Sequence, residues 1–453
     1  MLFRVFDLHR KKKYSKPIKN NKQPMKVNFI QLPKRSTPVL FVILFLLYFQ
    51  TVNAQIESIN SKTYQQVQNA EHVVVYQEEG KFLGWPANNG AWSADGVNML
   101  VGFTRGDYEL IKDNHNIGGN QESWLARSTD MGKTWEGYDP KNYVGDFGKE
   151  PELLTLDNPI NFSHPQFAMR MVGTSYHGAD DQRGHFFYSY NAGKSWSGPY
   201  RLGVDNIRDW PELKNTTLPA QTELTPRTDY VVKGKDECLV FMSVREKDQF
   251  GTDRLFSMRT IDGGKTFSFV SWVVPPFDEE KADLSIKVNL EEDEALNPHP
   301  DQCRAVMSQT VILASGKLIS AMRRRYEGHN WVDAYVSEDD GNSWTFLSEV
   351  GDAGAGNGNP PTLNITDEGR LVAIFGNRKE PGTMMVVYSD NEGVSWSNPK
   401  ILRDGYGSED METIDLGYPL LLKREDGKMV ALYYWSTKED LHHIAATIWD
   451  ADL

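Results

Sequence analysis

The chain has 453 residues, enough for one large domain or for two to three ordinary ones. Charged residues make up 25% and hydrophobic residues 39% of it, which is typical of a soluble globular protein. The net charge of −13 argues against non-specific binding to nucleic acid, because such binding requires a basic surface. Aromatic residues make up 11% and favour a β-rich fold, because flat side chains pack well on pleated sheets.

The N-terminal segment predicts a secretion signal. Residues 39–49 read VLFVILFLLYF, lysines and arginines precede this run, and Val52-Asn53-Ala54 offers a small-residue cleavage site. Eleven apolar residues are too few to cross a bilayer core of about 30 Å, so we expect no stable membrane span. We therefore predict a signal peptide with a long basic lead over 1–54 (about 25–54 if Met25 is the start). The mature protein, 55–453, is expected to be secreted or periplasmic.

One eight-residue pattern recurs five times along the mature chain, at spacings of 52–77 residues. It reads Ser/Thr, any, Asp/Asn, any, Gly, any, Ser/Thr, Trp/Phe. The Asp or Asn side chain is expected to bind backbone amides of a tight turn in which Gly takes a positive φ. The aromatic residue is expected to pack against the neighbouring sheet. The copies are Ser128–Trp135, Ser189–Trp196, Thr260–Phe267, Ser337–Trp344 and Ser389–Trp396.

Each copy lies between the third and fourth of four expected strands, which is the composition of a propeller blade. Six inner strands are expected to begin near Trp92, Phe167, Arg227, Ser308, Pro361 and Tyr418. The last unit, 415–450, supplies only three strands, and residues 72–76 (HVVVY) are expected to supply its fourth and so close the ring. The sequence therefore predicts an all-β protein: a six-bladed β-propeller of four-stranded antiparallel blades in a single domain, 55–453.

The five repeats resemble the Asp boxes of sialidases and their relatives, over nearly all of the mature chain. The resemblance implies a carbohydrate-active propeller whose boxes lie on the face away from the active site. It also implies that Tyr418, at the start of the sixth inner strand, matches the family's tyrosine nucleophile. The family's Phe/Tyr-Arg-Ile-Pro motif is replaced here by Gly84-Trp85-Pro86-Ala87, and an expected arginine near the fifth inner strand by Gly358-Asn359-Pro360-Pro361.

Residues at the starts of inner strands and at the ends of second strands are expected to converge on one central pocket. Arginines are frequent among them, and the planar guanidinium suits recognition of carboxylate or sulfate. The predicted catalytic residues are Tyr418, His177, His164 and Asp229. The predicted substrate-binding residues are Arg105, Arg227, Arg245, Arg323, Arg325, Arg378, Asn89, Trp92, Asn359 and Tyr434. The loop Asn114-His115-Asn116 is expected to rim the same pocket.

This inventory suits two reactions on a terminal acidic sugar. In the first, arginines neutralise the carboxylate of a uronate, as in ulvan-type glycans, and a tyrosine or histidine removes the adjacent proton in an elimination or dehydration. In the second, Tyr418 attacks the anomeric carbon while Asp229 or Asp180 protonates the leaving group, as in sialidases. The incomplete arginine set favours the first. A non-catalytic glycan-binding propeller is the alternative from another class.

Cofactors and metals are not implied by any motif. His299 and the pair His442-His443 lack metal-ligand spacing and are interpreted as surface residues. The two cysteines, Cys238 and Cys303, are either a disulfide or two buried thiols. The expected partner is an acidic glycan substrate.

Overall fold

A computed structural model describes a single compact unit within Tyr64–Leu453. The described residues are 64–111, 114–140, 143, 152–172, 184–202, 222–246, 253–288, 290, 296–354, 356, 358–407, 413–439 and 442–452. The predicted signal peptide lies outside them, so its cleavage and the predicted destination remain predictions.

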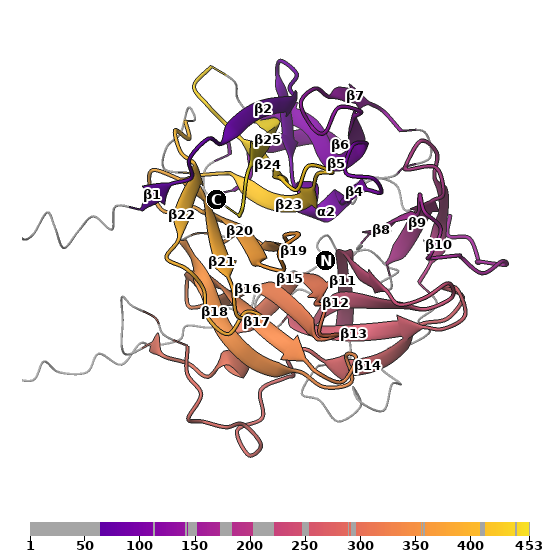
Figure 1. Ribbon diagram of the computed structural model, residues 1–453, viewed down its shortest axis with the longest axis vertical. Helices are drawn as coiled ribbons and strands as arrows, with labels where there is room; N and C mark the ends of the chain where they lie inside the picture. Colours follow the sequence, from indigo (N-terminus) through magenta and orange to yellow (C-terminus); the bar gives the residue numbers. More distant parts are fainter. Residues whose placement is uncertain are drawn as a thin grey trace, which may run out of the picture. The chain divides into compact units, whose positions relative to one another are not determined.

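The unit is a ring of six antiparallel sheets that surround a central axis, as Figure 1 shows. The first sheet comprises β3 (Lys81–Gly84), β4 (Ala91–Ser93), β5 (Met99–Tyr108), β6 (Ile117–Ser128) and β7 (Glu136–Tyr138). The second comprises β8 (Ala168–Val172), β9 (His185–Ser189) and β10 (Ser197–Arg201), and the third β11 (Thr222–Val232), β12 (Cys238–Glu246), β13 (Arg254–Thr260) and β14 (Ser268–Trp272).

The fourth sheet comprises β15 (Arg304–Ile312), β16 (Leu318–Tyr326), β17 (His329–Ser337) and β18 (Thr345–Gly354). The fifth comprises β19 (Thr362–Ile365), β20 (Leu371–Asn377), β21 (Thr383–Ser389) and β22 (Lys400–Arg403), extended by the short parallel strand β1 (Gln65–Gln66). The sixth comprises β2 (Glu71–Tyr76), β23 (Gly417–Lys423), β24 (Met429–Trp435) and β25 (His443–Trp449). Helix is confined to two short described segments, α2 (Pro86–Asn89) and the 3₁₀ turn η4 (Pro300–Gln302).

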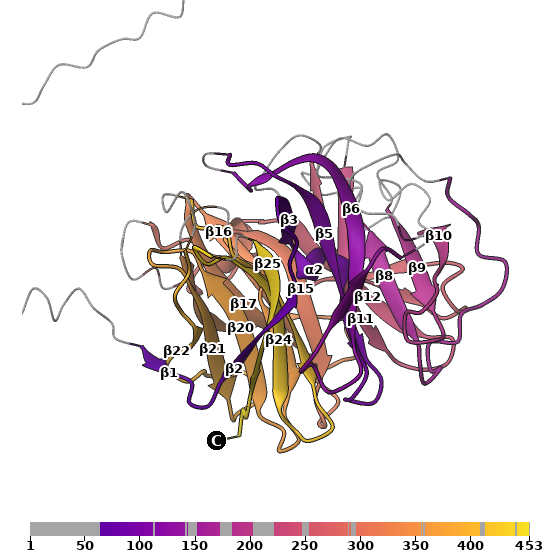
Figure 2. The ribbon, with the colours of Figure 1, turned by 90° about the horizontal axis from the view of Figure 1, so that it is seen from above.

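The ring closes through the two ends of the propeller unit, as predicted. Strand β2 pairs antiparallel with β25, with Val74 opposite Ala445, so that the first long strand completes the last blade. Figure 2 shows β2 running beside the strands of the last blade, where β25 is its neighbour. Closure of this kind removes two open sheet edges, and the six-bladed prediction is confirmed.

Six apolar clusters of the core each lie between a pair of neighbouring blades, and a seventh, smaller one comprises Val288, Cys303 and Trp331. The middle strands β20, β24 and β25 are buried along their whole length, because both of their faces pack against adjacent sheets. One cluster joins blades six and one through Leu432 and Phe103, and the next joins blades one and two through Leu125 and Phe187. The remaining four clusters join the other neighbouring pairs in order around the ring. Each buried aliphatic or aromatic side chain contributes about 1.5–3 kcal/mol to folding.

The five repeats form the same hydrogen-bonded turn in their blades. In the first, Asp130 Oδ1 accepts from the Thr134 amide at 2.9 Å, and the Gly132 amide donates to Ser128 Oγ at 2.9 Å. Gly132 has a φ of 81°, and Met131 before it also has a positive φ, of 63°. The predicted role of the Asp and Gly is confirmed. We call the side of the ring that carries these turns the box face, and the other side the opposite face.

Replacing Asp130 with alanine is expected to lower the free energy of unfolding by about 1–2 kcal/mol, because backbone amides lose their acceptor. Asp130→Asn should cost less, since Asn191 and Asn391 fill the same position in two other boxes and accept the same amides. Urea denaturation of both variants measures the difference. Equal losses in the two variants would show that the carboxylate charge, and not the turn geometry, is what stabilises the box.

The first two blades depart from the expected strand pattern. In blade one the inner strand is interrupted: β3 pairs with β5 at Thr104–Asp107, the short helix α2 follows, and β4 then pairs with β5 at Met99–Val101. Trp92 therefore lies near the box face, and its placement at an inner-strand start on the opposite face is wrong. In blade two, Ala168 is paired with Ser189 at the beginning of a box, so β8 runs away from the box face.

This direction of β8 also corrects the placement of His164. The residue comes just before β8 and contacts the box residue Tyr190, with ring centroids 4.7 Å apart. It was expected at the opposite face because an inner strand was expected to start near Phe167. The physical reason for the difference is that β8 has the direction of a second strand, although it is the innermost described strand of its blade.

Candidate active site

The opposite face collects the ends of second strands, where many of the predicted site residues were expected. The structure places Arg105 on β5, Arg245 on β12, Arg323 and Arg325 on β16 and Tyr434 on β24, each within four residues of the end of its strand, and Arg378 directly after β20. These strands belong to blades one, three, four, five and six. The hydrogen-bond and ion-pair partners of each side chain then decide which of them face a shared site.

A buried carboxylate, Asp415, organises the region between blades five, six and one. Arg378 Nη2 lies 3.3 Å from Asp415 Oδ1 and donates to the Tyr434 hydroxyl at 2.7 Å, and Tyr434 donates to the same carboxylate. The His115 Nδ1 atom lies 2.8 Å from Asp415 Oδ1, and the Asn116 amide donates to Oδ2 at 3.4 Å. We call Asp415, His115, Asn116, Arg378 and Tyr434, with His442 beside them, the Asp415 network.

The charges around Asp415 keep it ionised. Burial alone would raise its pKa, but the charge and hydrogen bond of His115 and the guanidinium of Arg378 outweigh burial and hold the pKa of Asp415 well below its ordinary value. An ionised carboxylate only accepts hydrogen bonds, so His115 Nδ1 carries the hydrogen. His115 Nε2, which makes no hydrogen bond to a described residue, is then the nitrogen that exchanges protons with a ligand. This is the orientation that a carboxylate imposes on an acid–base histidine.

Tyr418 lies beside this dyad. Its ring centroid is 6.2 Å from that of His115, and the Arg378 guanidinium lies 5.8 Å from the centre of its ring. Tyr418 is 7% exposed, and its hydroxyl makes no hydrogen bond within the described residues. Trp85 packs edge-on against His115 at 4.9 Å. The structure thus brings together a histidine, a tyrosine, an arginine and a tryptophan.

Backbone strain is concentrated at the same place. Trp85, Met307 and Tyr418 have φ values of 56°, 61° and 49°, and all three belong to the apolar cluster between blades six and one. A positive φ in a bulky residue costs about 1–3 kcal/mol and persists only where its surroundings enforce it. For Tyr418 the surroundings include Asn359, whose Oδ1 accepts from the Tyr418 amide at 2.7 Å while its Nδ2 donates to the Leu416 carbonyl. Asn359 is therefore a positioning residue for Tyr418.

Other predicted site residues have different surroundings. Arg105 is held in ion pairs by Glu78 and Glu122. Asn89 is fully buried and accepts from Arg170 at 2.7 Å. Asp229 accepts from Ser308 at 2.6 Å and from the Thr310 amide, which ties blade three to blade four, and burial raises its pKa to about 6.

Four predicted arginines line blades three and four. Arg323 is buried, with Nη1 3.8 Å from the sulfur of Met307, so it reaches the edge of the strained cluster. Arg227 and Arg245 are also buried. Arg325 is half-buried opposite Arg304, and burial together with the Arg304 charge lowers its pKa. His177 and Asp180 lie outside the described residues.

His442 and His443 are fully buried and His299 nearly so, so their interpretation as surface residues is wrong. His442 lies against Phe82 and Tyr434, and Asn116 Nδ2 lies 3.3 Å from its Nε2 atom. Burial lowers the pKa of His442 to about 4, although the nearby Asp415 charge opposes this shift.

This shift predicts acid lability. Because the folded state resists protonation of His442 while the unfolded chain accepts it, stability is lost as the pH falls from about 6.5 to 4, by about 3 kcal/mol. His442 has a φ of 39°, which asparagine tolerates. The variant His442→Asn is therefore expected to lose less unfolding free energy than wild type over this pH range. At pH 8 the difference in unfolding free energy between variant and wild type reflects the packing cost alone. If this difference stays constant down to pH 5, His442 is not the group whose lowered pKa makes the fold acid-labile.

The residues that sequence reasoning missed are Asp415, Trp85 and Met307, and His115 was expected only at the rim. Asp415 lies three residues before Tyr418, which the family resemblance had already singled out, and this closeness in sequence was the available signal. Trp85 stands where the family carries its arginine motif. Met307 gives no signal in the sequence, because its role depends on a positive φ.

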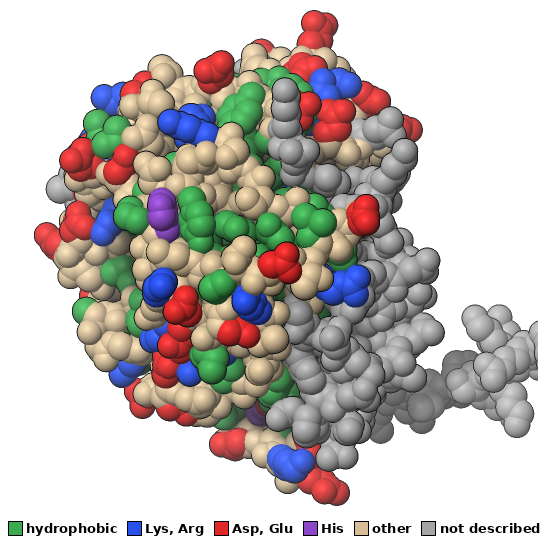
Figure 3. Space-filling view, turned by 90° about the vertical axis from the view of Figure 1, so that its right-hand side faces the viewer, with side chains coloured by type: hydrophobic (Ala, Val, Ile, Leu, Met, Phe, Trp, Pro, Cys, Tyr) green, Lys and Arg blue, Asp and Glu red, His purple; other side chains and the backbone are tan. Residues whose placement is uncertain are grey.

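The described surface carries charges of both signs. Figure 3 shows acidic and basic side chains interspersed over the side of the ring that bears β9 and β10. No described helix is both long and apolar enough to cross a membrane. Within the described residues no three His, Cys, Asp or Glu side chains are grouped to hold a metal ion. Cys238 and Cys303 are both buried free thiols, so the disulfide alternative is wrong.

Comparisons with known proteins agree with this architecture. The BNR repeat-like domain family matches residues 149–431. A solved protein of unknown function from Dyadobacter fermentans superposes with a TM-score of 0.57 at 16% identity, over 84% of this chain and 99% of that one. The α-L-arabinofuranosidase of Fusarium graminearum superposes with a TM-score of 0.50 at 12% identity, over 84% and 98%. No curated protein sequence matches. The chain belongs to the BNR repeat-like domain family of sialidase-like β-propellers.

Proposed function

We propose that this protein is a secreted, carbohydrate-active enzyme that cleaves a terminal sugar from a glycan at the Asp415 network. The observation that carries the proposal is the His115–Asp415 pair, with 2.8 Å between nitrogen and oxygen, next to Tyr418, whose hydroxyl makes no hydrogen bond to a described residue. A histidine oriented by a buried carboxylate is suited to proton transfer near neutral pH. The Trp85 ring offers an apolar surface beside it.

Hydrolysis is the favoured reaction, because the propeller of this chain is similar to that of an α-L-arabinofuranosidase. His115, protonated on Nε2, would give its proton to the glycosidic oxygen as the C–O bond breaks, while the Tyr418 oxygen attacks the anomeric carbon and releases its hydroxyl proton to water. A second water would then displace the tyrosine oxygen from the anomeric carbon. His115 would take one proton from that water, and the tyrosine oxygen would regain a proton from solvent. Asp229, proposed from the sequence as the acid, is 1% exposed and bound to blade four, so His115 is the better placed acid.

Elimination at a uronate is the second candidate. It is favoured because Asp415, the one described carboxylate beside Tyr418, is already bound by four partners and therefore does not serve as the acid or base. A histidine and a tyrosine would then share the acid and base roles, and Arg323 would neutralise the uronate carboxylate as the charge on the adjacent carbon develops.

Product analysis separates these reactions. The protein is incubated with arabinose-, sialic acid- and uronate-terminated oligosaccharides, and reducing sugar and ultraviolet absorbance are followed together. New reducing ends without absorbance indicate hydrolysis, whereas absorbance of an unsaturated uronate indicates elimination. Tyr418→Phe is the control that should remove either signal. Absence of both signals across the panel, with binding retained, would replace the enzyme proposal by a glycan-binding propeller.

A further inference from the structure

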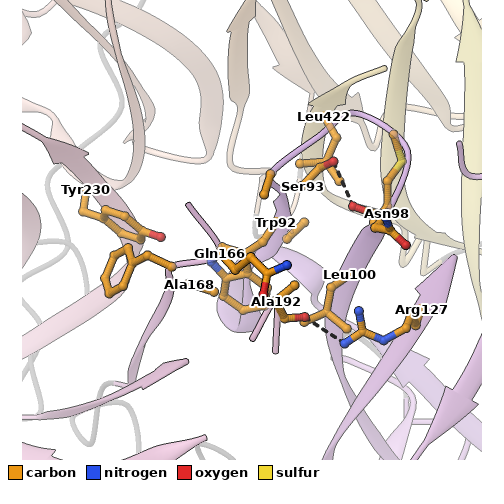
Figure 4. A pocket seen from close by; sticks show the side chains of 14 residues that line it. Trp92, Ser93, Asn98, Leu100, Arg127, Gln166, Ala168, Ala192, Tyr230 and Leu422 are labelled. Carbon is orange, nitrogen blue, oxygen red and sulfur yellow. Dashed lines mark hydrogen bonds between the residues drawn. The ribbon is translucent and has the colours of Figure 1, made fainter. Parts of the chain in front are cut away.

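A cavity of about 240 Å³ opens on the box face, away from the Asp415 network. Its lining comes from blades one, two, three and six, and includes Trp92, Arg127, Gln166, Phe167, Tyr230 and Leu422. Figure 4 shows Trp92, Gln166 and Ala192 lying between Tyr230 and Arg127. None of the residues of the Asp415 network lines this cavity, so the two sites are separate.

The cavity has a rigid aromatic wall. Trp92 is fixed by packing against Trp196 of the second box, with ring centroids 5.2 Å apart. Tyr230 accepts from the Met169 amide at 3.2 Å, and burial raises its pKa, so its hydroxyl keeps its hydrogen at all physiological pH values. Phe167 continues the apolar surface. Flat, immobilised rings of this kind match the apolar faces of a sugar ring.

A positive charge lies at the edge of this wall. Arg127 Nη2 donates to the Ala192 carbonyl at 2.8 Å and to the Tyr138 hydroxyl at 3.4 Å, and Arg127 has no acidic partner among the described residues. Its remaining N–H groups are therefore available to an anion. The exposed amide side chains of Asn98 and Gln166 supply further donors and acceptors at the opening.

We propose that this cavity is a second glycan-binding site, which takes one sugar ring that bears a carboxylate. Its volume is below the range of about 300–1,000 Å³ typical of sites for larger ligands, which suits a single ring. The lining contains no histidine and no carboxylate, so the site binds and does not catalyse. Because it lies on the other face from Tyr418, it would hold a glycan strand independently of cleavage. This inference goes beyond the proposed function and stands without it.

The test uses the full chain and ligand-observed NMR with glucuronate as the probe and glucose as the neutral control. Ala94 is exposed at the opening, so Ala94→Trp fills the mouth without disturbing the core. It is expected to abolish binding of glucuronate. Arg127→Gln is expected to weaken glucuronate about tenfold or more, and to bring it to the level of glucose. Tyr418→Phe, at the other site, is the matched control and should leave this binding unchanged.

The outcomes separate the two sites. Loss of glucuronate binding in Ala94→Trp, with turnover of a small soluble substrate retained, supports the second site. Binding that survives Ala94→Trp, or that disappears in Tyr418→Phe, overturns it and assigns the uronate to the Asp415 network. Equal affinity of the wild type for glucose and glucuronate overturns the role given to Arg127. A wild type that binds neither sugar overturns the proposal, whatever the enzymatic activity.

Discussion

Replacing His115 with alanine is expected to lower kcat/KM by about 10²–10⁴-fold while the protein stays folded. The size of the effect is that of a general acid–base group, and His115 is the described histidine with one ring nitrogen bound to a buried carboxylate and the other unbound. The side chain is 19% exposed and packs against Trp85 and Tyr418, so its removal also costs some packing, which must be measured apart from the kinetics. The measurement is steady-state kinetics on the substrate identified by product analysis, with urea unfolding to verify the fold.

His164→Ala is the matched control for this variant. His164 was also predicted to be catalytic, but it lies beside Tyr190 in the second box and therefore near the box face. It is expected to leave kcat/KM within about twofold of wild type, because surface substitutions away from a site have small effects. Comparable losses of kcat/KM in the two variants would show that His115 affects activity only through stability and is not a catalytic residue.

Local turn chemistry made most of the fold predictable. The box pattern specifies its own hydrogen bonds within eight residues, so five copies determined five blades without any tertiary information. Ring closure was also predictable, because the three strands of 415–450 required a partner and β2 was the remaining apolar strand near the N-terminus. The direction of β8 was not predictable, because a short apolar strand has the same residue pattern whichever way it runs between the two faces of the ring.

The site was less predictable because its residues acquire their roles from partners far along the chain. Asp415 and His115 are 300 residues apart, and neither shows in sequence that it is bound to the other. The predicted arginines show the same limit. Arg378 and Arg105 both lie at second-strand ends, yet one is buried against Asp415 and the other forms a partly exposed ion pair with Glu78. The position of each arginine in its strand predicted that it lies towards the opposite face, whereas the acidic groups that it contacts determine its function.

Arg378→Met is expected to lower the free energy of unfolding by about 3–5 kcal/mol, the loss typical of removing one partner of a buried ion pair. The Asp415 carboxylate would stay buried without its nearest permanent cation, and the Leu416 carbonyl would lose donors at 3.2 and 3.0 Å. The pKa of Asp415 should rise towards its ordinary value. In the wild type the ion pair stabilises the folded state at pH values above the pKa of Asp415, and acid removes this stabilisation. In Arg378→Met the stabilisation is expected to be missing already at neutral pH. Urea unfolding at pH 7 measures the first effect, and unfolding followed downward from about pH 4, where an aspartate of ordinary pKa 3.8 takes up its proton, measures the second.

Two companion variants make this prediction specific to burial. Arg105→Met removes an arginine of the same length from a partly exposed pair with Glu78 and Glu122, and is expected to cost about 1 kcal/mol or less. Arg378→Met combined with Asp415→Asn removes both charges, so it should regain part of the loss of the single variant, because no uncompensated charge remains buried. If the double variant is as unstable as the sum of the two single variants, the Asp415 network is held by packing, and the electrostatic account of the site that holds His115 in place fails with it.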